Sequence, residues 1–153
     1  MVEIHIRGGR KKQRRIVHEA IEWAAYDLHH KRMADNLEIE AEILNLGDMA
    51  GYCIWSDSNI APRSFELELN VKQSDEDLIV TVMHEMVHVW QYATGRVRER
   101  FRPMHRQIWK NSSRWYGDTK YSELPWEREA YKLQEELYDK SVSYTHLTLP
   151  TKA

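Results

Sequence analysis

The segment SDEDLIVTVMHEMVHVWQYATG (residues 74–95) places His84, Glu85 and His88 inside an otherwise apolar helical pattern. Apolar residues flank the three polar side chains, so the helix is expected to be largely buried, and these side chains with it. Burying a polar side chain costs free energy unless another group pairs with it. The chain is therefore expected to fold so that partners for these side chains meet at this one helix.

Local signals mark both ends of this helix. Ser74, with Asp77 three residues later, approximates a capping box and predicts the N-terminus. Gly95 follows the last apolar residues and predicts the C-terminus, because glycine readily adopts the left-handed conformation found there. The motif thus lies in the middle of a helix.

His84 and His88 are four residues apart, which places them on one face of a helix about one turn from each other. Their imidazoles can bind the same metal ion, and zinc suits neutral imidazole ligands with water in an open position. Glu85 is next to the first histidine and can act as general base toward that water. The pattern is typical of metallopeptidases. It predicts zinc-dependent hydrolysis of peptide bonds by a metal-activated water. The simpler alternative is a pair of core-edge histidines with ordinary hydrogen bonds.

A third metal ligand has to come from elsewhere, and the sequence offers Glu127 in LPWEREAY and His105 in MHRQIWK. On a helix starting at Pro125, Glu127 shares a face with Ala130 and points inward beside the apolar stripe. Glu129 falls on another face and is expected to be a solvated charge. A carboxylate would also offset the charge of the metal in a buried site. We therefore favour His84, His88 and Glu127 as the ligands, with His105 as the alternative.

These motifs resemble those of the zincin-like metallopeptidases. The gluzincin branch takes its third ligand from a helix with a glutamate followed three residues later by a small residue, as in Glu127-Arg128-Glu129-Ala130, although Tyr131 stands where an acidic residue is usual. Residues 2–138 as a whole resemble small phage-encoded zincin proteins. The rival resemblance is to SprT-like proteases, which act on DNA-bound proteins and use a histidine as third ligand. His105-Arg106-Gln107-Ile108-Trp109-Lys110 fits their pattern except for a missing glycine.

Alternating apolar and polar residues predict strands at residues 2–6, 37–43, 52–55 and 65–69. Helical spacing of apolar residues predicts an N-terminal helix that ends near Asp35, the motif helix, and a last helix that begins at Pro125. The basic segment after Gly95 is expected to be a loop or a hairpin. The predicted fold is α+β and zincin-like, with a mostly antiparallel sheet packed on the first two helices and a further C-terminal helix.

Of the 153 residues, residues 1–140 are expected to form a single zincin-like metallopeptidase domain. The last stretch, SVSYTHLTLPTKA (residues 141–153), resembles the read-through translation of a sequencing-library end in metagenomic assemblies. It continues no helical period, and we expect it to be a non-native tail.

Composition limits the partners. The net charge is −2, and the single cysteine, Cys53, excludes an intramolecular disulfide and a cysteine-based metal cage. No apolar run would span a membrane, and a cytoplasmic setting (host cytoplasm if viral) is expected. Besides a peptide or protein substrate, the basic stretch Arg7–Arg15 suggests contact with nucleic acid, or simply a solvated loop and helix start. The remaining histidines of the N-terminal half are expected to lie at the surface or around the site rather than in it: His5, His18, His29 and His30.

Overall fold

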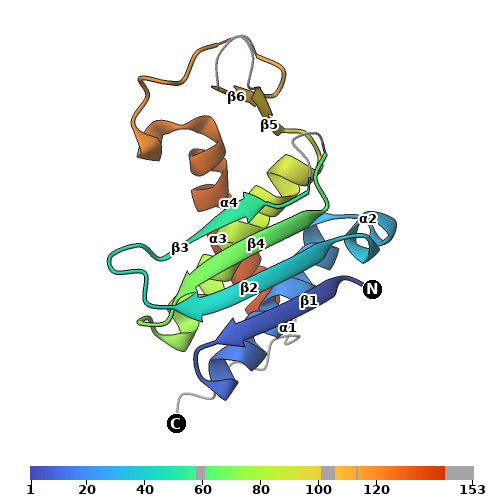
Figure 1. The fold of residues 1–153 in the computed structure, drawn as a ribbon, viewed down its shortest axis with the longest axis vertical. Helices are drawn as coiled ribbons and strands as arrows, with labels where there is room; N and C mark the ends of the chain where they lie inside the picture. The colour runs from blue at the N-terminus through green and yellow to red at the C-terminus, as the bar shows by residue number, and fades with distance from the viewer. Residues whose placement is uncertain (58–60, 101–105, 113, 144–153) are drawn as a thin grey trace.

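The computed structural model describes residues 1–57, 61–100, 106–112 and 114–143. They form a four-stranded sheet with helices on one face and a two-stranded hairpin at one end of the molecule (Figure 1). In chain order the elements are β1 (Glu3–Gly8), α1 (Lys11–Leu28), α2 (Lys31–Asp35), β2 (Glu38–Leu44), β3 (Gly51–Trp55), β4 (Ser64–Asn70), α3 (Asp75–Ala93), β5 (Val97–Arg100), β6 (Arg106–Trp109), the 3₁₀ turn η1 (Tyr121–Glu123) and α4 (Pro125–Ser143).

The sheet has the strand order β1-β2-β4-β3. β1 pairs with β2 and β2 with β4 in parallel, and only β3 is antiparallel to its neighbour β4. The prediction of a mostly antiparallel sheet is therefore wrong, and the sheet is mixed. β3 does not form a hairpin with β2, because β4 lies between them. The apolar side chains of β2 and β4 are more completely buried than those of β3. Strands with such apolar side chains are favoured at the centre of a sheet, where the helices cover them most fully.

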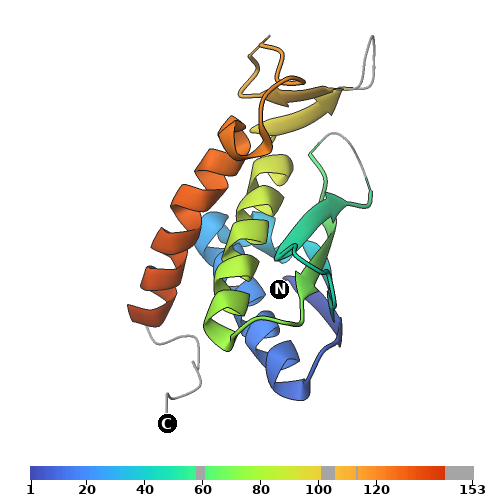
Figure 2. The same ribbon diagram turned by 90° about the vertical axis from the view of Figure 1, so that its left-hand side faces the viewer.

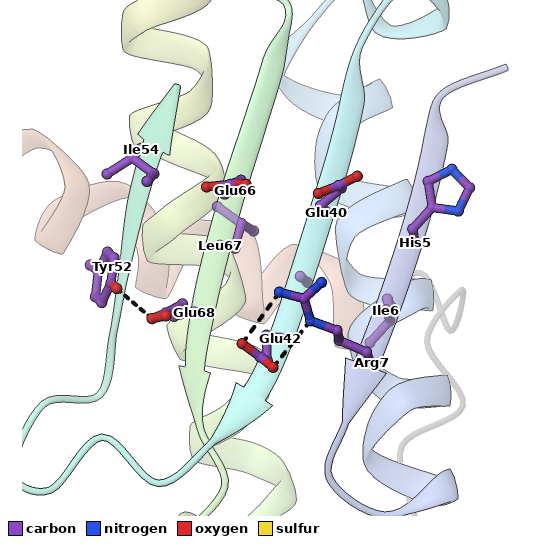
Figure 3. A pocket seen from close by; sticks show the side chains of 11 residues that line it. His5, Ile6, Arg7, Glu40, Glu42, Tyr52, Ile54, Glu66, Leu67 and Glu68 are labelled. Carbon is purple, nitrogen blue, oxygen red and sulfur yellow. Dashed lines mark hydrogen bonds and ion pairs between the residues drawn. The ribbon is translucent and has the colours of Figure 1, made fainter. Parts of the chain in front are cut away.

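The two faces of the sheet differ in chemistry. The face toward the helices is apolar and carries buried side chains of β2 and β4: Ile39, Ala41, Ile43, Phe65, Leu67 and Leu69. The opposite face is open and polar, with glutamates of β2 and β4 side by side in register (Figure 3). On that open face Arg7 pairs with Glu42, and the hydroxyl of Tyr52 donates to Glu68. The hydrophobic core therefore lies between the apolar face of the sheet and the helices that cover it.

Figure 2 shows the layers from the side: α1 and α3 lie against one face of the sheet, to its left in this view, and α4 packs along α3. The predicted single N-terminal helix is two helices. α1 ends at Leu28, His29 adopts an extended conformation, and the imidazole of His30 caps α2 by accepting from the backbone N–H of Met33. No helix in the described part of the chain is both long and apolar enough to cross a membrane.

The ends of α3 confirm the predicted signals. The hydroxyl of Ser74 accepts a hydrogen bond from the backbone N–H of Asp77 at 3.1 Å. Gly95, at φ +77°, follows the helix and leads into β5. The predicted hairpin is also present, as β5 paired antiparallel with β6. α3 is thus held at both ends, with the motif at its centre.

The last helix passes the predicted domain end at residue 140. Ser141 is fully buried, and its hydroxyl donates to the carbonyl of Tyr138 at 2.7 Å. The tail was predicted at residues 141–153, and its residues 144–153 lie outside the described residues. We expect truncation after Lys140 to lower stability by about 1 kcal/mol, a melting-temperature shift of about 2–4 °C, because it removes a buried residue and the last turn. Truncation after Ser143 is expected to leave the melting temperature unchanged. Thermal unfolding of both truncated proteins tests this, and equal losses would contradict it.

Candidate functional site

α3 presents both histidines of the motif on the face that α4 covers. His84 and His88 are buried, and their Nε2 atoms are 3.2 Å apart. The rings meet edge to face with centroids 4.9 Å apart. Two nitrogen donors one helical turn apart thus converge on one point, as the spacing of the motif predicts.

Glu127, in the first turn of α4, lies against both histidines. Its Oε1 is 3.1 Å from Nε2 of His84, and its Oε2 is 3.0 Å from Nε2 of His88. One ligand atom from each of the three residues lies within 4.8 Å of the others, and all three residues are buried. The structure therefore brings together the three predicted ligands. The alternative, His105, lies outside the described residues.

The charges of this cluster are strongly coupled. Burial alone would raise the pKa of Glu127, but hydrogen bonds from the two histidines hold it at about 2. Burial alone would lower the pKa of His88, but the Glu127 carboxylate raises it above its ordinary value. The carboxylate thus remains ionised between the two rings, in the position that favours a cation.

Glu85 is also buried, and it differs from Glu127 in its surroundings. Its Oε2 atom has no hydrogen-bond partner in the described part of the chain. Burial raises the pKa of Glu85, and the nearby histidines offset this only in part. Because buried polar atoms are rarely left without partners, this one calls for a partner such as a water molecule or a substrate group. Glu85 therefore contributes a buried carboxylate oxygen that can accept from a group bound beside the cluster.

A glutamine orients each histidine. Nδ1 of His84 is 2.8 Å from Oε1 of Gln134, on α4, and Nδ1 of His88 is 2.8 Å from Oε1 of Gln91, on α3. An amide oxygen only accepts, so each Nδ1 carries a hydrogen, and loss of the hydrogen that Nε2 shares with Glu127 would leave Nε2 as the ligand atom. Hydrogen bonds to the second ring nitrogen orient metal-binding histidines in this way.

Gln91 also connects the site to the hairpin. Its Nε2 donates to the carbonyl of Trp126 at 2.9 Å and to Oε1 of Glu129 at 3.0 Å. Glu129 in turn pairs with Arg96, whose guanidinium stacks on the ring of Trp90. The prediction that Glu129 is a solvated surface charge is therefore wrong, because it is half-buried and supports the orientation of Gln91.

Neither glutamine was predicted, although both have a sequence signal. Gln91 is one turn after His88 on the same helix, and Gln134 is two turns after Glu127 on the inward face of α4. The other histidines of the N-terminal half are not brought to the site. His5 lies on the open face of the sheet, and His30 caps α2.

Exchanging Gln91 for methionine is expected to weaken zinc binding by about 10- to 100-fold, because His88 loses the acceptor that orients its ring. Competition with a chromogenic chelator measures the affinity. The matched control is Gln107→Met, since Gln107 lines the same cleft but bonds to the hydroxyl of Tyr92. An unchanged affinity in Gln91→Met would exclude this role.

A cleft runs along α3 past the cluster, between the outer strand β3 and the start of α4. A cavity of about 410 Å³ lies beside His84 and Glu85. A second, of about 220 Å³, is lined by Glu85, His88 and Glu127 together with Cys53 of β3. A third, of about 310 Å³, extends toward the hairpin. Tyr121 lines all three cavities, so they adjoin one another around this side chain, and Glu85 lines the first two.

The helix α3 carries the motif HExxH (residues 84–88) and packs under a sheet whose outer strand β3 borders the cleft. This arrangement is compatible with a zincin-like protein. The model of the SprT-like family matches residues 16–129, a span that contains His84, Glu85, His88 and Glu127. The chain belongs to the SprT-like family, whose members are zinc-metallopeptidase-like. No curated protein and no solved structure matches the chain. The rival resemblance noted from the sequence is thus the one that the family comparison supports.

Proposed function

We propose that this protein is a zinc-dependent peptidase in which His84, His88 and Glu127 hold the metal and Glu85 is the general base. The observation that carries the proposal is the buried cluster of three ligand groups beside a fourth carboxylate whose Oε2 has no partner among the described residues. Membership of the SprT-like family supports the same class of activity. The gluzincin type of ligand set, with Glu127, is part of the proposal.

The donor set fits zinc. Two imidazoles and one carboxylate are the protein ligands of one common class of catalytic zinc site, which keeps a further position for water. Each Nε2 atom is directed at the cluster because a glutamine accepts from the Nδ1 of the same ring. The ionised carboxylate of Glu127 offsets part of the metal charge in this buried place.

The chain's own residues then divide the chemistry. A zinc ion held there would polarise the scissile carbonyl and lower the pKa of the attacking water. Glu85 accepts the proton that this water loses as the new C–O bond forms, and it delivers the proton to the amine as the C–N bond breaks. The raised pKa of Glu85 suits a group that both accepts and releases a proton.

The outer strand β3 positions the substrate in this proposal. Among the described strands β3 pairs only with β4, and Tyr52 and Cys53 of β3 line the cavity that contains Glu85. An extended peptide can add to such an edge by main-chain hydrogen bonds. Its scissile bond would then lie over α3, within reach of Glu85.

Metal analysis of the purified protein tests the proposal. We expect about one zinc per chain. We also expect a chelator to remove both the metal and hydrolysis of an unfolded protein substrate, and added zinc to restore both. Absence of zinc from protein that was purified and then exposed to zinc would contradict the assignment.

A second candidate function is action on proteins bound to nucleic acid, which the resemblance to SprT-like proteases implies. In the basic stretch Arg7–Arg15, Lys12 pairs with Asp75 and Arg14 bonds to the carbonyls of Gly8 and Gly9. Arg10, Lys11 and Arg15 are exposed and could contact phosphates. Anisotropy of a labelled single-stranded oligonucleotide, at several salt concentrations, tests this partner. If charge reversal at Arg10, Lys11 and Arg15 leaves oligonucleotide binding unchanged, these residues do not form the binding site.

A further inference from the structure

Large exposed apolar side chains gather at the cleft. Among the described residues, six such side chains stand out: Met1, Met49, Ile54, Trp115, Tyr121 and Tyr131. Three of these six, Met49 (52% exposed), Tyr121 (65%) and Tyr131 (50%), line the cavity of about 410 Å³ beside His84 and Glu85. Exposed apolar groups that cluster around a concave site are typical of a ligand-binding surface rather than of ordinary protein surface.

Tyr131 stands where the gluzincin pattern usually has an acidic residue. An acidic side chain there could accept a hydrogen bond from His84, but Tyr131 does not take this role. Gln134 accepts from Nδ1 of His84 instead, at 2.8 Å, while the ring of Tyr131 lies on the His84 ring with centroids 4.6 Å apart. Tyr131 is therefore free to form a wall of the cavity, directly beside one metal ligand.

Small and apolar residues contribute part of the remaining lining, next to the polar side chains of His84 and Gln134. Val80 and Thr81 of α3 contribute one side, and Ala50 and Gly51 at the start of β3 contribute the other. The charged residues that line the cavity, Asp48 and Glu85, are both acidic. The space of about 410 Å³ thus accommodates a large side chain, and its charges disfavour an acidic one.

We propose that this cavity, which we call the Met49–Tyr131 subsite, binds a large apolar side chain of the substrate next to the scissile bond. The inference rests on the proposed function, because it assigns the substrate class to the same site. Phenylalanine, leucine and similar side chains would bury against Met49, Tyr121 and Tyr131. Segments rich in such residues are exposed in unfolded rather than folded proteins, so the substrate class is an unfolded, apolar stretch of polypeptide.

A series of ten-residue peptides that differ at one central position tests the subsite. The central residue is Phe, Leu, Ala, Lys or Glu in turn. With the zinc-loaded protein, we expect kcat/KM for Phe and Leu to exceed that for Ala by at least about 10-fold, and Glu to be the poorest. The same series is titrated against zinc-loaded Glu85→Gln protein, which reports binding without requiring turnover.

Met49→Ser is the informative variant, because Met49 is exposed and its loss should not disturb the core. We expect it to reduce the ratio of Phe to Ala, in cleavage and in binding, by at least about 5-fold. Ile54→Ser is the matched control, since Ile54 is 45% exposed but lies on the open face of the sheet (Figure 3). It is expected to leave the ratio unchanged.

The two readouts separate failure of the subsite from failure of the proposed function. Apolar preference in binding without any cleavage would support the subsite and contradict the peptidase. Cleavage or binding with equal values for Phe, Ala and Glu, or a preference for Lys, would overturn the subsite and leave the peptidase intact. Equal effects of Met49→Ser and Ile54→Ser, or no binding of any peptide, would also overturn it.

Discussion

Replacing Glu127 by alanine is expected to lower zinc affinity by more than about 100-fold, because loss of a ligand should exceed the effect of losing an outer hydrogen-bond partner. Glu127 contributes a carboxylate 3.1 Å from Nε2 of His84 and 3.0 Å from Nε2 of His88. Without it, the two imidazoles would hold the metal alone, with no charged ligand to offset the charge of the ion. Competition with a chelator of known affinity measures the loss.

His105→Ala is the decisive comparison for Glu127→Ala. His105 is the third ligand implied by the SprT-like pattern in the sequence, and we expect its replacement to leave zinc affinity unchanged. The circular dichroism spectrum of each variant is first compared with that of the parent protein. This control separates loss of a ligand from loss of zinc affinity through unfolding. Loss of the metal in His105→Ala with retention in Glu127→Ala would contradict the ligand set proposed above.

Exchanging Glu85 for glutamine is expected to abolish hydrolysis while zinc content stays at the parent value. An amide cannot accept the proton of the attacking water, and general base catalysis contributes about 100- to 10,000-fold in rate. The metal-free variant should be at least as stable as the parent, because a neutral amide replaces a buried carboxylate whose Oε2 has no partner among the described residues. Turnover, zinc content and melting temperature are measured on the same preparation.

Two results would change this account of Glu85. Unchanged turnover in Glu85→Gln would remove Glu85 from the mechanism. A parent protein that binds zinc but cleaves no unfolded protein or peptide would favour a second class of function, an alternative also compatible with the sequence: a zincin-fold protein that binds a partner without catalysis. The intact motif argues against that alternative, since a binding protein has no need for the base.

The helices and strands were largely predictable because their signals are local. Alternation of glutamate with apolar residues marks β2 and β4, and the structure confirms both strands. The cap at Ser74 and the glycine at position 95 mark the ends of α3. Each signal acts within a few residues of the element that it defines, so one sequence is sufficient to read it.

Strand order was not predictable in the same way. Alternation shows which side of a strand is buried but not which strand lies beside it or in which direction it runs. β4 lies between β2 and β3, although β3 follows β2 in the chain. This arrangement depends on how much of each strand the helices cover, which is a property of the assembled core. The error in sheet type has this origin.

The metal cluster was predictable in its residues but not in its supports. The spacing of His84 and His88, and the inward face of a helix carrying Glu127, are local properties, and the structure places these three residues together. The roles of Gln91 and Glu129 depend on the angle at which α4 crosses α3, and no pattern within one helix contains that angle. Outer residues of a site therefore need the packed structure.

The most direct test of the central claim is a crystal structure of the zinc-loaded protein with anomalous data collected at the zinc absorption edge. The proposed ligand set predicts one strong peak about 2.0–2.2 Å from Nε2 of His84, Nε2 of His88 and a carboxylate oxygen of Glu127. A peak bound by the two histidines and His105, with Glu127 turned away, would contradict the ligand set. A protein that crystallises from zinc-containing solution with no peak at this cluster would contradict the metal centre itself.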